Sequence, residues 1–123
     1  MLERNLSNLA VLDSAESRSI SAENPTGEKG KGGTASSVLG KGRKGKAYLD
    51  LEAGKETALA DIYGSGIIRH IWITVQDCSP AGEFVLRDLV LRMYWDGSDE
   101  PAVESPLGDF FCCGFSAKCV VNS

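Results

Sequence analysis

The stretch "KAYLDLEA", residues 46–53, decides the fold class. Small and aliphatic residues occupy every second position and alternate with Lys, Tyr, Asp and Glu, which is the period of a strand with one buried face. Two more apolar stretches follow, "TALADIYG" (57–64) and "IIRHIWITV" (67–75), and the second is rich in β-branched residues. The three stretches predict consecutive β-strands.

Two further stretches extend this prediction toward the C-terminus. "FVLRDLVLRMYW" (84–95) also fits a helical stripe, but the preceding strands and the aromatic pair before the turn-forming "DGSDEP" favour a strand. "AVESPLGDFFCCGF" (102–115) predicts a short strand, a bend at 106–108 and an aromatic strand. Short strands joined by Gly and Pro turns are typical of a sandwich or barrel, so the predicted fold class is all-β.

The region before the strands has a different character. "LSNLAVL" (6–12) spaces its leucines as a short helix does, so residues 1–13 are predicted to be an N-terminal helical segment. Residues 14–46 hold Pro25 and seven of the 14 glycines, which excludes regular core structure and predicts a long polar Gly/Lys-rich loop. Residues 47–123 are then a partial sandwich. Because the chain stops directly after the apolar pair in "CVVNS", we expect a truncated or assembly-dependent sandwich.

Composition limits the class of protein. The chain has 123 residues, of which 42% are hydrophobic, enough for one modest globular domain. It contains no apolar run long enough to span a membrane and no export signal, so we expect a cytoplasmic protein without a membrane partner. The cysteines lack paired CxxC spacing and lie far from the only histidine, so neither a metal site nor a cofactor is predicted.

The basic residues are concentrated in the polar loop. The formal net charge is −4, yet the segment from Arg18 to Lys46 holds seven basic and two acidic residues, a net +5. A solvated loop and an anionic-ligand site are both consistent with this charge. "GEKGKGGT" (27–34) has Gly33 where a phosphate-binding loop needs its lysine, so that motif is rejected. Nucleic-acid binding is not predicted because the segment lacks aromatic residues on which bases stack.

Two groups of residues are candidates for sugar chemistry. Glycoside hydrolysis needs two carboxylates on opposite sides of one bond, and several lie near one loop, but no spacing selects two of them as catalytic. These are Asp96, Asp99, Glu100, Glu104 and Asp109. His70 and Trp72 fall on one face of the 67–75 strand, either as satisfied core residues or as a sugar platform. In the second interpretation, Trp72 stacks on the ring and His70 or Arg69 reaches its hydroxyls.

Three blocks together resemble a known family: "SRSISAENPTGEKGKGG" (17–33), "LADIYGSGIIRHIWITV" (59–75) and "MYWDGSDEPAVESPLGDFF" (93–111). They resemble the N-terminal part of glycoside hydrolase family 172, over about residues 6–123. The resemblance implies the first, incomplete jelly-roll β-sandwich of two in tandem, and assembly as a trimer or a multiple of it. It also implies retaining activity on α-D-fructofuranosides or α-D-arabinofuranosides, including formation of difructose anhydride.

The resemblance further implies which residues bind the substrate. The family's catalytic glutamates lie outside the part that this chain resembles, so no catalytic residue is named. The first block contributes to the sugar pocket, where Asn24, Thr26 and Glu28 offer an amide, a hydroxyl and a carboxylate to a furanoside. His70 and Trp72, chosen from the strand pattern above, are the other predicted substrate-binding residues. Two alternatives stay open: a noncatalytic carbohydrate-binding or assembly module, and a binder of anionic ligands through the basic residues 41–46.

Overall fold

The computed structural model describes residues 14–34, 37–38, 40, 43–77, 80 and 82–114. The chain divides into two compact units, Met1–Gly66 and Ile67–Ser123. The helix predicted within residues 1–13 and the C-terminal "CVVNS" lie outside the described residues.

The first unit consists of turns and extended chain in its described part. Ser21 and Asn24 form an isolated antiparallel bridge, and the Lys55 amide closes a turn by donating to the Glu52 carbonyl at 3.1 Å. No strand is assigned to the described residues of this unit, so the strands predicted at 46–53 and 57–64 are extended chain instead. Alternation sets which side chains share a face, but a strand also needs a hydrogen-bonded neighbour, and neither stretch has one among the residues that the structure describes.

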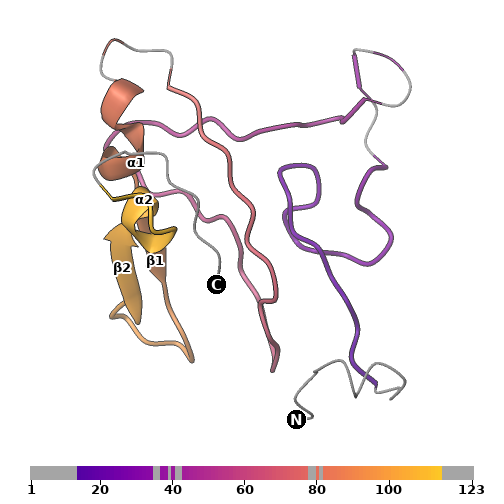
Figure 1. The fold of residues 1–123 in the computed structure, drawn as a ribbon. Helices are drawn as coiled ribbons and strands as arrows, with labels where there is room; N and C mark the ends of the chain where they lie inside the picture. The colour runs from indigo at the N-terminus through magenta and orange to yellow at the C-terminus, as the bar shows by residue number, and fades with distance from the viewer. Residues whose placement is uncertain are drawn as a thin grey trace. The chain divides into compact units, whose positions relative to one another are not determined.

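The second unit contains the helices and strands that the described residues form. Their bounds are η2 Gly82–Phe84, α1 Val85–Asp88, β1 Val90–Met93, β2 Val103–Pro106 and α2 Leu107–Phe110. β1 and β2 pair antiparallel, with Val90 opposite Pro106 and Met93 opposite Val103. α1 and α2 lie at one end of this hairpin and its loop at the other (Figure 1).

A small apolar cluster forms where the helices meet. Leu107 is the one buried hydrophobic residue among those described, with 7% of its surface exposed, and its amide donates to the Leu89 carbonyl at 2.8 Å. Gly108 is buried beside it, because a Cβ at that position would lie 3.1 Å from the Leu86 Cβ and 3.0 Å from the Cys113 carbonyl oxygen. The glycine therefore allows α1 and α2 to approach closely.

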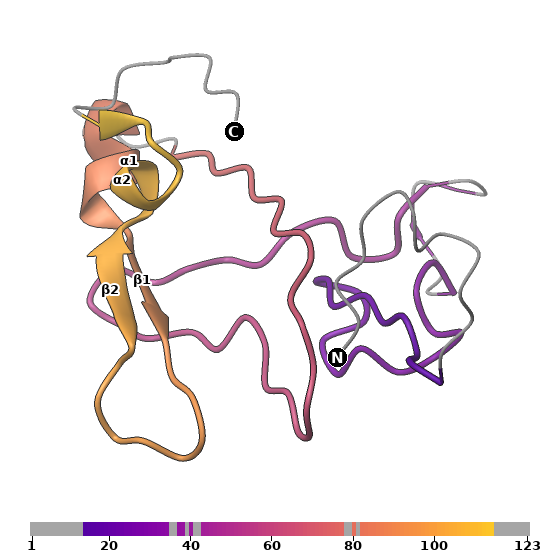
Figure 2. The same cartoon turned by 60° about the horizontal axis from the view of Figure 1, so that its bottom comes forward.

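The end of α2 has a specific geometry. The Cys113 amide donates to the Gly108 carbonyl at 2.7 Å and the Cys112 amide to the Asp109 carbonyl at 3.0 Å, the two bonds of a Schellman motif. Cys112 occupies the left-handed position of that motif with φ +60°, where glycine is the usual residue. Figure 2 shows the chain turning back after the short helix α2.

Ion pairs join neighbouring elements of the second unit. Arg87 of α1 donates to Asp109 of α2, and Arg92 donates to Glu104 at 2.6 Å directly across the β1–β2 ladder. All four side chains keep a third or more of their surface exposed, so each pair fixes geometry more than it stabilises the fold.

Three strand predictions are corrected in this unit. The stretch 67–75 is extended chain to which no strand is assigned. The stretch 84–95 begins as helix and becomes a strand only from Val90, because Leu86 and its neighbours pack against α2 with helical spacing. The stretch predicted as an aromatic strand after the bend is the helix α2, with Phe110 and Phe111 stacked edge to face at 5.0 Å. The two-stranded sheet is compatible with a mostly-β chain, and the jelly-roll sandwich stays a prediction. Among the described residues, no helix combines the length and the apolar character required to cross a membrane.

Candidate functional site

The polar turn from Ser19 to Glu28, here called the asparagine turn, is held by backbone and side-chain hydrogen bonds. The Ser21 and Asn24 backbones exchange hydrogen bonds of 3.2 and 3.0 Å, and the Gly27 amide donates to the Asn24 carbonyl at 3.1 Å. Asn followed by Pro favours the start of a turn, since proline fixes its own φ and keeps the preceding residue out of helix. Local sequence chemistry therefore accounts for the reversal.

The Asn24 side chain holds the two ends of this turn together. It is only 6% exposed, and its Nδ2 donates to the Ser19 carbonyl at 3.0 Å and to the Glu28 carbonyl at 3.1 Å. Its Oδ1 accepts from the Glu28 amide at 3.2 Å. Both amide hydrogens and the oxygen are thus engaged within the turn, as a buried polar group requires.

Gly27 allows the turn to close on itself. Its φ is +63° and it is buried, and a Cβ there would lie 2.9 Å from the Ile20 Cγ1 atom. Its carbonyl accepts a long hydrogen bond of 3.5 Å from Arg18. A side chain at this position would meet both backbone strain and a steric clash, so glycine is required.

Charged residues on one side of the turn neutralise each other. The Glu16 carboxylate accepts from Arg18 at 2.6 Å and from Lys29 at 3.2 Å. The hydrogen bond from Arg18, and then that from Lys29, lowers the pKa of Glu16 below its ordinary value of 4.5. The two cations nearest the turn are therefore already paired.

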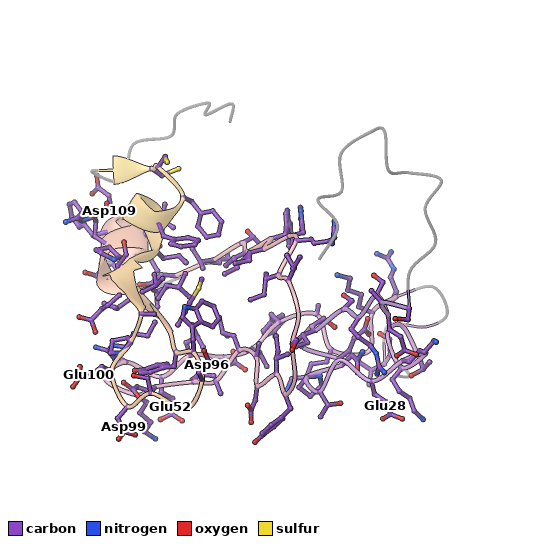
Figure 3. The ribbon with its side chains drawn as sticks, turned by 90° about the horizontal axis from the view of Figure 1, so that it is seen from below. Glu28, Glu52, Asp96, Asp99, Glu100 and Asp109 are labelled. Atoms are coloured by element: carbon purple, nitrogen blue, oxygen red, sulfur yellow. The ribbon has the colours of Figure 1, made fainter. Side chains whose placement is uncertain are left out.

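Two polar side chains of the turn are available to a ligand. Thr26 and Glu28 are exposed, and neither the hydroxyl nor the carboxylate has a partner among the described residues. Figure 3 labels Glu28 in this part of the chain. The turn thus presents one hydroxyl and one carboxylate on a backbone that Asn24 and Gly27 hold in place.

A family model described as GH172 domain-like matches residues 42–121. The chain belongs to this family. The GH172 domain-like match covers more than half of the chain and relates it to a glycoside hydrolase family, which confirms the resemblance seen in the sequence. It includes two of the three resembling blocks and begins after the asparagine turn. No curated protein and no solved structure matches the chain.

The predicted binding residues of this GH172 domain-like chain fall into two groups. Asn24, Thr26 and Glu28 come together in the asparagine turn, whereas His70 and Trp72 belong to the second unit. Trp72 is 72% exposed, and its chain neighbours Ile71 and Ile73 are half-buried. This agrees with the period of two predicted for the stretch and leaves the indole face open for stacking. That both groups line one pocket stays a prediction.

The acidic residues that were candidates for catalysis lie at both ends of the β1–β2 hairpin. Asp96, Asp99 and Glu100 lie in the β1–β2 loop, and Asp109 lies at the opposite end beside the helices (Figure 3). Asp96 has φ +54° and the next residue +73°, the conformation expected of an Asp-Gly pair in a tight turn. Glu104 and Asp109 are both paired to arginines. No two of these carboxylates are assigned to catalysis.

Sequence reasoning missed one contact that organises the first unit. The Glu23 carboxylate accepts from the Gly45 amide at 3.3 Å and so connects the asparagine turn to a segment 22 residues later. The Asn-Pro-Thr-Gly run indicates a turn locally, but no local signal predicts a contact at that separation.

Proposed function

We propose that the chain supplies part of the sugar pocket of a retaining glycoside hydrolase that acts on α-D-fructofuranosides or α-D-arabinofuranosides. Membership of the GH172 domain-like family supports the glycoside hydrolase relation. The substrate class comes from the resemblance of the sequence to family 172. In this proposal the chain folds as part of a jelly-roll sandwich and binds the furanose without supplying the catalytic carboxylates.

The asparagine turn is the observation that carries the proposal. A sugar pocket needs a few polar groups held at fixed positions, since loose groups lose conformational freedom when they bind. The buried Asn24 side chain fixes the turn through its three hydrogen bonds. The Thr26 hydroxyl can donate or accept, and the Glu28 carboxylate accepts from two adjacent sugar hydroxyls. Asn24 is then a positioning residue, while Thr26 and Glu28 contact the sugar.

Aromatic stacking is the second element of the proposal. Sugar rings have apolar faces that pack against flat aromatic side chains, and Trp72 presents such a surface. His70, two residues before it in the chain and on the same face of the extended segment, would hydrogen bond to a ring hydroxyl. We propose that Trp72 and His70 supply these contacts to the sugar.

A binding measurement tests the assignment of the asparagine turn. Calorimetry with methyl α-D-arabinofuranoside is carried out on the wild type and on the variants Thr26→Ala and Glu28→Gln, with Asp50→Asn as the matched control. Asp50 is an exposed carboxylate of the same unit without a partner among the described residues. We expect each turn variant to weaken binding by about fivefold to tenfold, the loss of one hydrogen bond to a ligand. Unchanged binding by both variants, with an unchanged circular dichroism spectrum, would remove the asparagine turn from the pocket.

Exposed apolar residues favour a second candidate, a noncatalytic assembly or carbohydrate-binding module. Tyr63 is 90% exposed and Tyr48 is 70% exposed, both in extended chain of the first unit. Exposed apolar surface of this kind marks contact with another polypeptide. The candidate predicts a trimer or larger assembly that binds the glycoside but does not hydrolyse an aryl α-D-arabinofuranoside when joined to the rest of the family's fold. Hydrolysis by that assembly would exclude this candidate.

A further inference from the structure

The segment 43–46, here called the basic segment, carries three cations that form no ion pair with a described residue. Arg43, Lys44 and Lys46 are exposed, and none of them forms an ion pair or a hydrogen bond with a described residue. Three other described basic residues of this unit do form ion pairs, since Arg18, Lys29 and Lys55 each pair with a glutamate. The basic segment is therefore a local excess of positive charge.

This segment is attached to the asparagine turn. The Gly45 amide, in the middle of the basic segment, donates to the Glu23 carboxylate at 3.3 Å. Glu23 and Gly45 are both half-buried, and Glu23 directly precedes the buried Asn24. The contact holds the cations next to the turn that presents Thr26 and Glu28, rather than leaving them to a freely moving loop.

The positive charge of the basic segment favours an anionic ligand. The Glu23 carboxylate, which accepts from the Gly45 amide, offsets one of the three positive charges, and Glu16 is occupied by Arg18 and Lys29, so the segment keeps a net positive charge. Three like charges within four residues repel each other, so a bound anion lowers the electrostatic free energy. Arg43 can donate two parallel hydrogen bonds to a phosphate, sulfate or carboxylate, and the lysines add point charges.

We propose that the basic segment binds an anionic substituent on the furanoside that the asparagine turn holds. The substrate class is thereby narrowed to furanosides that carry a phosphate, sulfate or carboxylate group, or that are linked to a sugar carrying one. The assignment of the furanose ring to the asparagine turn rests on the proposed function. The anion site stands on the basic segment itself and on its contact with Glu23.

The test compares two probes that differ by one phosphate group: methyl α-D-arabinofuranoside and its 5-phosphate ester. Dissociation constants are measured for the wild type, for the triple variant Arg43→Gln, Lys44→Gln, Lys46→Gln, and for the control Lys55→Gln. Lys55 is an exposed cation of the same unit that pairs with Glu52. Inorganic phosphate is titrated separately, and each titration is repeated at low and high salt.

The expected result is a preference of about tenfold for the phosphate ester in the wild type, as three exposed charge contacts can give. The preference should shrink at high salt, disappear in the triple variant and persist in the control, while binding of the neutral glycoside stays the same in all three. Equal binding of the two probes by the wild type, or a preference that survives in the triple variant, would overturn the proposal. Inorganic phosphate that binds as tightly as the ester would also overturn it, because the anion would then not belong to the sugar.

The outcome separates this proposal from the proposed function. If the neutral glycoside does not bind but the ester binds through the basic segment, the furanose assignment fails and the anion site stands. If the neutral glycoside binds at the asparagine turn and the ester gains nothing, the furanose assignment stands and the anion site fails.

Discussion

Replacing Asn24 by alanine should open the asparagine turn. The substitution removes three hydrogen bonds of 3.0 to 3.2 Å and leaves the Ser19 carbonyl and both backbone groups of Glu28 without these partners. Each bond contributes about 1 kcal/mol, so the free energy of opening the turn should fall by about 3 kcal/mol. Asn24→Asp should behave similarly, because a carboxylate can accept from the Glu28 amide but cannot donate to the two carbonyls.

The loss of stability of the turn can be measured by the hydrogen exchange rate of the Gly27 amide, which is not part of the substituted side chain. The Gly27 amide donates to the Asn24 carbonyl, a backbone bond that both variants keep. A loss of about 3 kcal/mol corresponds to exchange about a hundredfold faster at Gly27, or to exchange at the unprotected rate if the turn is less stable than that. The Lys55 amide, bonded to Glu52 in a separate turn, is the internal control and should not change. Exchange at Gly27 within threefold of the wild-type rate would show that the Asn24 side chain does not hold the turn.

Further substitutions test the packing of the second unit and the charges of the first. Gly108→Ala should destabilise the protein by about 1 kcal/mol in urea unfolding, since crowding against Leu86 and a carbonyl outweighs the better helix propensity of alanine. Gly114→Ala, where a Cβ meets nothing within 4 Å, is the matched control, and equal stability of the two variants would refute the packing argument. The Glu16 carboxyl should titrate below 4.5 by NMR and return toward that value in Arg18→Gln. Because the pKa of Glu16 is lower in the folded chain than in the unfolded chain, its ion pairs stabilise the fold at pH values above the unfolded pKa. This stabilisation is lost as the pH falls through the folded pKa. A Glu16 titration midpoint at 4.5 in the wild type would contradict this.

The sequence predicted those features that depend on neighbouring residues. In 67–75 the sequence predicted a period of two, and burial alternates in this way from Ile71, half-buried, through the exposed Trp72 to Ile73, half-buried, although the sequence did not predict which face would be buried. The short strand predicted before the bend occurs as β2, whereas the bend predicted at 106–108 is the end of β2 and the start of the helix α2. The turn around Asn24 follows from its position before proline.

Features that depend on contacts between distant residues were not predictable from the sequence. The stretch 84–95 fits both a strand and a helix, and the packing of Leu86 against α2 decides for helix at its start. Cys112 at a left-handed position has no sequence signal, because glycine is the residue expected there. The Asn24 amide was expected to face the sugar, and its hydrogen bonds to the backbone of its own turn were not predicted, since an asparagine side chain can bind either.

The most direct test of the proposed sugar pocket is an NMR titration of the isotopically labelled chain with methyl α-D-arabinofuranoside. Saturable shifts of the Thr26 and Glu28 amides, accompanied by shifts of the Trp72 indole and absent in Glu28→Gln, are the predicted result. Saturable binding that leaves the asparagine turn unperturbed, or no binding at millimolar glycoside by a chain whose Gly27 amide is protected, would contradict the account.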